Sequence, residues 1–213
     1  MKEIMDYFPT IIGELRIECA LGKGKSGYSY LAYHDRQPRV LKVMHNEPCP
    51  YYQFNDNKTR LEVDAYHRLK QIDIPLPHLI AYDLERQYLI KEFIDGPTAA
   101  EWLAKGNHDD AVISQLFRLS RKLRRAHLNI DYFPTNFVLS RGKLVYIDYE
   151  LNLYDPKWGL ENWGLYYWAN AAGMARYLRS GDAAAINLPP DSGEPLREPF
   201  QAQVEKWIEA YGK

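Results

Sequence analysis

The sequence has few cysteines and no long hydrophobic run. Cysteine occurs only at Cys19 and Cys49 in 213 residues. This pair provides neither a disulfide framework nor a metal-type motif, which favours a reducing compartment. The opening stretch, MKEIMDYFPT, lacks the apolar run of a signal peptide, and no later stretch reaches the length of a membrane-spanning helix. We therefore expect a cytoplasmic protein.

The chain also lacks a strong net charge. Its formal charge is −1 at pH 7, so no long-range field favours a nucleic-acid or membrane partner. The local exception is the basic run Arg118–Arg125, which we interpret as the solvent face of a helix rather than a nucleic-acid patch. The sequence contains no internal repeat or low-complexity segment, and its length suits one large domain or two small lobes.

The most informative stretch is DYFPTNFVLSRGKLVYIDYE, which begins at Asp131 and ends at Glu150. Two short apolar strands flank a glycine-containing turn, the pattern of a β-hairpin. Because a hairpin returns to where it began, Asp148 should lie close to Asn136, with Asp131 just before them. Two carboxylates and an amide form an oxygen-rich site suited to Mg²⁺. The alternative is a surface hairpin with capping polar residues.

The Asp-x-x-x-x-Asn spacing from Asp131 to Asn136 is weak evidence by itself. The same spacing recurs from Asp182 to Asn187, where neither a hairpin nor a second aspartate follows. Other parts of the chain must therefore decide between a functional and a purely structural hairpin.

A glycine-rich loop near the start of the chain contains Gly22, Gly24 and Gly27. Aromatic, β-type residues follow it instead of a helix, so we expect the loop to join two antiparallel strands. Glycine allows a backbone to approach a ligand closely. The embedded Gly-Lys-Ser is not a phosphate-binding Walker motif, because Cys19 stands where that motif requires glycine.

Lys42 lies among strand-forming residues in the segment 39–44, and a buried ammonium requires a partner. Helical spacing over residues 59–72 places Glu62 on the inward face, where it can pair with Lys42. The inward face of this helix also carries Ala65, Tyr66 and Leu69. One alternative is an edge-strand Lys42 that points to solvent. The other is a capping box formed by Thr59 and Glu62.

The remaining pattern predicts further strands and helices. We expect strands over residues 15–19, 28–33, 78–82 and 88–94, and helices over 98–104, 109–127, 157–179 and 199–211, with a proline-rich connector at 188–199. The aromatic residues of the helix over 157–179 are expected to lie in the core.

The order of these features resembles the protein-kinase-like superfamily over about residues 15–168. The run IPLPHLIAYDLERQYLIKEFIDGPT is similar to the hinge approach of aminoglycoside- and choline-type kinases and of small bacterial protein kinases. The resemblance implies an α+β, bilobal fold with one kinase domain. Residues 1–95 would form an N-lobe with an antiparallel sheet and one main helix, and residues 96–213 a reduced, mainly helical C-lobe. In the C-lobe, Glu161 or Asn162 of the helix over 157–179 would brace the stretch that begins at Asp131.

The resemblance also implies catalytic and metal-binding roles. Asp131 would orient and deprotonate the attacking hydroxyl, and Asn136 and Asp148 would hold magnesium. Lys42 would hold the α- and β-phosphates of ATP, and Glu62 would pair with that lysine.

The expected nucleotide contacts lie in the first lobe. Gly22, Gly24 and Gly27 would cover the phosphates of ATP, and backbone groups around Glu92 to Ile94 would bind adenine.

The expected activity is ATP- and Mg²⁺-dependent transfer of a phosphate to a hydroxyl, in the manner of a Ser/Thr protein kinase. ATP and an unidentified protein or small-molecule acceptor are the expected partners. Phe133 and the sequence Ile-Asp-Tyr-Glu that ends at Glu150 instead favour a small-molecule acceptor such as a sugar or amino alcohol. A third possibility is a nucleotide-binding pseudokinase that acts as an interaction module.

Overall fold

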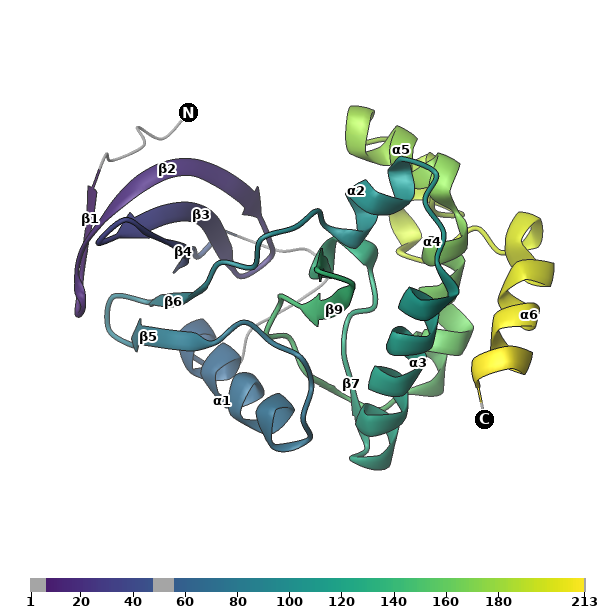
Figure 1. Ribbon diagram of the computed structural model, residues 1–213, viewed down its shortest axis with the longest axis horizontal. Helices are drawn as coiled ribbons and strands as arrows, with labels where there is room; N and C mark the ends of the chain where they lie inside the picture. Colours follow the sequence, from purple (N-terminus) through teal and green to yellow (C-terminus); the bar gives the residue numbers. More distant parts are fainter. Residues whose placement is uncertain (1–6, 48–55, 213) are drawn as a thin grey trace. The chain divides into compact units, whose positions relative to one another are not determined.

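The computed structural model describes residues 7–47 and 56–212 (Figure 1). The expectations for the first six residues and for Cys49 lie outside these ranges. The fold is α+β, with a curled, six-stranded antiparallel sheet followed by mainly helical structure (Figure 1). Within the described residues, no helix is long and apolar enough to cross a membrane.

The chain divides into two compact units. Unit 1 consists of the described residues up to His67 together with Pro77–Ile94. Unit 2 consists of Arg68–Leu76 and the described residues from Asp95 onward. The C-terminal end of the first helix therefore groups with the second unit, although most of that helix belongs to the first.

Unit 1 is built around the six-stranded sheet, whose strand order is β1-β2-β3-β4-β6-β5. The strands are β1 Tyr7–Thr10, β2 Gly13–Lys23, β3 Gly27–His34, β4 Gln37–Met44, β5 Leu79–Asp83 and β6 Tyr88–Glu92. In the ladder, Lys42 pairs with Ser29 of β3 and with Leu89 of β6. Lys42 thus lies on an internal strand and not at a sheet edge.

The core of unit 1 forms because alternating apolar residues share one side of the strands. Its buried members are Leu15, Ala32, Leu41, Ala81, Tyr88 and Ile90. The aromatic ring of Phe8 packs edge-on against Tyr88, which ties β1 to the core. The strand expected over residues 15–19 is β2, which is longer in the structure and spans Gly13–Lys23.

Helix α1 spans Lys58–Gln71 and presents the predicted face inward. Glu62, Ala65, Tyr66 and Leu69 are all buried. Asn57 caps the helix, because its side-chain Oδ1 accepts a hydrogen bond from the Arg60 amide at 3.1 Å. The 3.6-residue period therefore predicted the buried face correctly.

Unit 2 is mainly helical. Its helices are α2 Ala99–Ala104, α3 Asp110–Arg125, α4 Leu165–Ala169, α5 Ala171–Ser180 and α6 Gln201–Tyr211, and its short strands are β7 Leu128–Asn129, β8 Phe137–Ser140, β9 Lys143–Tyr146 and β10 Asn152–Leu153. Short 3₁₀ segments are Pro134–Asn136, Pro156–Trp158, Ala183–Ala185, Pro190–Ser192 and Glu198–Phe200, and a π-helical turn covers Leu160–Gly164.

Helices α2, α3, α4 and α6 of unit 2 share one apolar core, and α5 joins a second, smaller cluster through Met174. The shared core includes Leu116, Phe117 and Leu123 of α3, Trp168 of α4 and Trp207 of α6. Helix α2 packs on α5, and α6 packs on both α3 and α4 (Figure 1). This core fixes the segment that leads from α3 into the residues around Asp131.

The single helix expected over residues 157–179 is wrong, because Asn170 divides it. The Asn170 side chain accepts a hydrogen bond from the Gly173 amide at 2.8 Å and donates one to the Ala185 carbonyl at 3.0 Å. Asparagine side chains compete with the helical ladder for backbone partners in this way. Asn170 therefore ends α4 and caps α5.

The basic run of α3 behaves as the face of a helix with local partners. Lys122 pairs with Asp73 at 2.6 Å, Arg121 donates to the Tyr211 carbonyl at 2.5 Å, and Arg124 lies 3.6 Å from a carboxylate oxygen of Glu161. These contacts account for several of its charges within unit 2.

Candidate functional site

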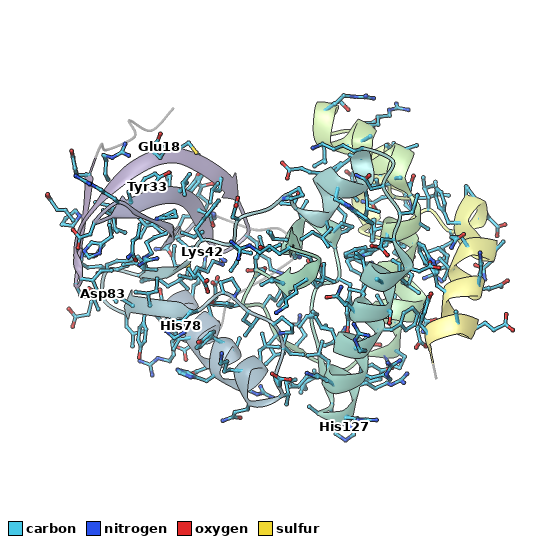
Figure 2. All side chains as sticks on the ribbon, in the orientation of Figure 1. Glu18, Tyr33, Lys42, His78, Asp83 and His127 are labelled. Carbon is cyan, nitrogen blue, oxygen red and sulfur yellow. The ribbon has the colours of Figure 1, made fainter. Side chains whose placement is uncertain are left out.

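In unit 1, Lys42 and Glu62 form a buried ion pair (Lys42 is labelled in Figure 2). Lys42 Nζ lies 2.5 Å from Glu62 Oε1, and the two side chains are only 8% and 9% exposed. The predicted pair is confirmed, and the solvent-facing alternative for Lys42 is wrong. The capping box is also wrong, because Asn57 caps the helix and Thr59 Oγ1 finds no hydrogen-bond partner in the described part of the chain.

A third residue, which sequence reasoning missed, completes this cluster. Ser26 of the glycine-rich loop donates a hydrogen bond from Oγ to Glu62 Oε1 at 2.8 Å, and Ser26 is 7% exposed. The second carboxylate oxygen, Glu62 Oε2, is buried without a hydrogen-bond partner among residues 7–47 and 56–212. The only available signal was that Ser26 lies one residue before a glycine of the loop.

The glycine-rich loop joins β2 and β3, as predicted. It is closed by a hydrogen bond from the Gly24 amide to the Gly27 carbonyl at 2.9 Å. His45 attaches the loop to the end of β4, because its amide donates to Ser26 O at 3.1 Å and its Nε2 lies 3.0 Å from Gly24 O. His45 Nδ1 accepts from the Glu47 amide at 3.2 Å, so Nε2 carries the proton and donates to Gly24.

The three positions of the loop hold glycine for different reasons. A Cβ on Gly27 would lie 2.6 Å from Val43 O, so the sheet itself requires glycine there. A Cβ on Gly24 would meet only Gly27 O at 3.9 Å, and one on Gly22 would meet no described atom within 4 Å. Gly22 and Gly24 therefore leave space that the protein's own described atoms do not fill, as a loop that approaches a ligand requires.

An exposed charge cluster lies beside the loop, and no motif predicted it. Glu47 accepts hydrogen bonds from Lys23 Nζ at 2.5 Å and from the Tyr28 hydroxyl. The Lys23 bond and then the Tyr28 bond lower the pKa of Glu47 to about 2. The same carboxylate raises the pKa of Lys23 and of Tyr28.

Glu92 ends β6, and Ile94 is the last residue of unit 1. The Glu92 amide donates to His78 O at 2.9 Å, and its carboxylate accepts from the His78 amide at 3.1 Å (His78 is labelled in Figure 2). The amide of Glu92 is thus used by the protein, so a ligand would have to use other backbone groups of this segment.

In unit 2, the predicted hairpin is confirmed. Strands β8 and β9 pair with Phe137 opposite Tyr146, and the turn contains Gly142 at a φ of 76°. The Ile147 amide donates to Asn136 O at 2.9 Å, which continues the pairing by one step. Asp148 therefore follows directly after the residue that is bonded to Asn136.

Asp131 and Asn136 are linked within one turn. Asp131 Oδ1 accepts from the Phe133 amide at 2.9 Å, and Asn136 Nδ2 lies 3.4 Å from Asp131 O. Asn136 Oδ1 receives no hydrogen bond from any residue that the structure describes. In the second copy of the spacing, by contrast, Asn187 accepts from the Tyr167 hydroxyl and donates to a backbone carbonyl.

The donor set around Asn136 fits a magnesium ion. Asn136 Oδ1 and the Asp148 carboxylate are hard oxygen ligands, and Mg²⁺ commonly takes one or two protein ligands and completes its shell with water and phosphate. Within the described ranges there is no cluster of three His, Cys, Asp or Glu side chains that could hold a metal. A site here would therefore depend on an Asn–Asp pair and on oxygens from a ligand.

Tyr146 of β9 is a buried residue whose hydroxyl is affected by acidic groups of unit 2. Its hydroxyl donates to the Glu150 carbonyl at 3.1 Å. Burial raises the pKa of Tyr146 well above its ordinary value, and the negative charges of Asp148, Glu150 and Asp131 raise it further. The three carboxylates thus act on one hydroxyl. A tyrosine in a β-type run gave no signal of this role.

The brace for the segment around Asp131 comes from Trp168. Its indole Nε1 donates to Tyr132 O at 2.9 Å, and both side chains are buried. The candidates Glu161 and Asn162 do not fill this role, because Glu161 lies near Arg124 and Asn162 donates to a backbone carbonyl outside this segment. The aromatic-rich segment was therefore located correctly, but the bracing residue was not.

No protein-family model matches the chain, and no curated protein matches its sequence.

Proposed function

We propose that the protein is an ATP- and Mg²⁺-dependent phosphotransferase that moves the γ-phosphate to a hydroxyl. We further propose a bilobal, protein-kinase-like fold in which unit 1 serves as the N-lobe and unit 2 as the C-lobe. The observation that carries the proposal is the buried Lys42–Glu62 pair, which is hydrogen-bonded to the glycine-rich loop through Ser26.

Unit 1 has the chemistry to hold a polyphosphate. The Lys42 ammonium has three donors, and Glu62 keeps it charged and oriented inside a largely dry environment. The open space at Gly22 and Gly24 would let the loop backbone approach phosphate oxygens, and because the Gly24 amide donates to Gly27 O, other loop amides would make the contacts. Backbone groups between Glu92 and Ile94 are the proposed contacts for adenine.

Unit 2 has the chemistry to orient the reacting groups. Asn136 Oδ1 and the Asp148 carboxylate would hold Mg²⁺, which neutralises charge on the phosphates when it is bound. Asp131 would align the acceptor hydroxyl and take its proton. The Phe133 amide fixes one oxygen of the Asp131 carboxylate at 2.9 Å, which limits how far the proposed base can rotate.

The acceptor is proposed to be either a Ser/Thr hydroxyl or a small molecule, and Phe133 favours the second. The ring of Phe133 packs edge-on against Tyr167 at 4.9 Å and against Tyr177 at 5.9 Å. An aromatic side chain fixed in this way places an apolar group two residues after Asp131, where Ser/Thr protein kinases often carry a lysine.

The experiment compares three aspartate variants for γ-phosphate release or autophosphorylation from labelled ATP, and for thermal stabilisation by Mg·ATP. Asp148→Asn should lose the Mg²⁺-dependent stabilisation. Asp131→Asn should keep it, but its turnover should fall at least about a hundredfold, the usual contribution of a positioned base. Asp182→Asn is the matched control, because Asp182 begins the second copy of the spacing and is bonded to Arg176 at 2.6 Å.

Three outcomes separate the candidates. If wild type neither binds Mg·ATP nor turns it over, the proposal is wrong. If wild type binds Mg·ATP but transfers no phosphate to water, to itself or to any acceptor, the chain is a nucleotide-binding interaction module. If Asp182→Asn is as impaired as Asp131→Asn, then the loss reflects damage to unit 2 and not loss of the base.

A further inference from the structure

Ser26 occupies an unusual place for a residue of an otherwise open loop. Lys23 and Gly24, which come just before it, are exposed, whereas Ser26 is 7% exposed and its hydroxyl is directed at Glu62 Oε1. The same carboxylate oxygen lies 2.5 Å from Lys42 Nζ. One atom of Glu62 therefore connects the loop, the strand that carries Lys42, and helix α1.

The backbone of Ser26 is held as firmly as its side chain. The His45 amide donates to Ser26 O at 3.1 Å, and Lys58 Nζ, from the first turn of α1, donates to the His45 carbonyl. Gly27 is fixed by its close approach to Val43. The loop is thus attached to β4 and α1 at its C-terminal end, and Gly22 and Gly24 lie in the part that remains open.

These contacts restrict the orientation of the ion pair. A carboxylate bound only by a lysine can rotate and exchange its two oxygens. A second donor on Oε1 selects one rotation, and Glu62 Oε2 is left without a partner in the described part of the chain. Fixing Glu62 also fixes the direction in which the Lys42 ammonium points. A site arranged in advance loses less entropy when a ligand binds.

We propose that Ser26 is a positioning residue for the nucleotide phosphates, acting through Glu62 on Lys42 and through its own backbone on the glycine-rich loop. This inference rests on the proposed phosphotransferase function. It assigns to Ser26 the task of coupling the loop to the ion pair, so that both meet the phosphates in one arrangement.

The test measures the Kd for Mg·ATP by calorimetry, together with KM for ATP and kcat. Ser26→Ala should raise Kd and KM about tenfold, the loss expected for one hydrogen bond to a charged group, while kcat falls less. Ser26→Thr keeps the hydroxyl and should restore most of the affinity. Ser29→Ala is the matched control, because Ser29 lies in the same hairpin and its hydroxyl bonds to none of the described residues.

A second arm asks whether Ser26 acts through the ion pair. In a Lys42→Met background, Ser26→Ala should change the Kd for Mg·ATP less than twofold, because there is no ammonium left to orient. If Lys42→Met abolishes binding altogether, the Ser26→Thr rescue tests the need for the hydroxyl instead, and a failure of Ser26→Thr to recover Kd and KM overturns the inference.

The results distinguish this inference from the proposed function. If wild type binds no Mg·ATP, the proposed function fails first. If wild type binds Mg·ATP and Ser26→Ala matches it in both Kd and KM, or if Ser29→Ala is equally impaired, only the inference about Ser26 is wrong. An unchanged KM with a lower melting temperature would assign Ser26 a structural role alone and would also overturn it.

Discussion

The Lys42–Glu62 pair makes a prediction about stability that does not depend on any activity. Both side chains are less than a tenth exposed, and their charged atoms lie 2.5 Å apart. Removing one member of such a pair leaves the other charge buried without its counterion. The single variants Lys42→Met and Glu62→Met should therefore be destabilised much more than the double variant.

The magnitude follows from burial. Breaking a buried pair costs about 3–5 kcal/mol of unfolding free energy, whereas an exposed pair contributes roughly 0–1 kcal/mol. Ser26 remains as a donor to Glu62 when Lys42 is removed. We therefore expect a loss of about 3 kcal/mol for Lys42→Met and a comparable loss for Glu62→Met. The double variant replaces both charges with apolar groups and should lie within about 1 kcal/mol of wild type.

The position of the tryptophans makes the assay specific for unit 1. All five tryptophans fall after residue 95, at Trp102, Trp158, Trp163, Trp168 and Trp207. In urea denaturation, tryptophan fluorescence therefore reports unit 2, while far-UV circular dichroism reports both units. The single variants should lower the urea midpoint of the unit 1 transition, which circular dichroism detects and tryptophan fluorescence does not.

The prediction is wrong if the losses of unfolding free energy in the two single variants are small or add up in the double variant. If Lys42→Met and Glu62→Met each cost less than about 1 kcal/mol, or if the double variant loses the sum of the two, the side chains are not coupled in a dry environment. An equal shift of the fluorescence transition would instead place the effect outside unit 1.

Two further predictions concern the same unit. Gly27→Ala should cost roughly 1–3 kcal/mol of unfolding free energy, because its Cβ would lie 2.6 Å from Val43 O. Gly22→Ala should change stability by less than about 1 kcal/mol yet weaken Mg·ATP binding, and equal destabilisation of both variants would contradict this. Glu47 has its pKa lowered to about 2 from 4.5, so its contribution to stability is complete above pH 4.5 and is lost as the pH falls toward 2. The difference in unfolding free energy between wild type and Glu47→Gln should therefore be constant above pH 4.5 and disappear near pH 2; a difference that grows on acidification would refute this.

Features governed by local periodicity were predictable from the sequence. The helical period placed Glu62 on the buried face of α1, and the turn at Gly142 placed the hairpin in its observed register. In both cases, neighbours within a few residues decide which side chains share a face. The α+β class and the antiparallel sheet, by contrast, were expected from the family resemblance and not from local periodicity.

Choices between competing hydrogen-bond partners were not predictable. The capping alternative at the start of α1 used Thr59 and Glu62, whereas in the structure Asn57 caps the helix and Glu62 turns inward to Lys42. Asn170 lay within an apparently continuous helical pattern, yet its side chain bonds to Gly173 and thereby ends α4. A polar side chain has several nearby partners of similar strength, so the tertiary contacts decide which one it takes.

Contacts between segments far apart in the chain could not be predicted from the sequence either. Trp168 supports Tyr132 across 36 positions of the chain, and Ser26 reaches Glu62 over the same separation. Trp168 belongs to no motif with a fixed spacing, and the spacing of the loop glycines does not specify the residue at Ser26. Such contacts depend on how whole elements pack, which short patterns do not encode.

The two copies of the Asp-x-x-x-x-Asn spacing show what gives a motif its meaning. At Asn187, both ends of the amide are used within unit 2, by the Tyr167 hydroxyl and by a backbone carbonyl. At Asn136, the hairpin takes only the backbone carbonyl, through the Ile147 amide, and the side-chain oxygen has no donor among the described residues. A protein that needed Asn136 only as a cap would bond that oxygen. The spacing alone is therefore neutral, and the unused side-chain oxygen of Asn136, with Asp148 one residue after the paired Ile147, is what supports the proposed metal-binding role.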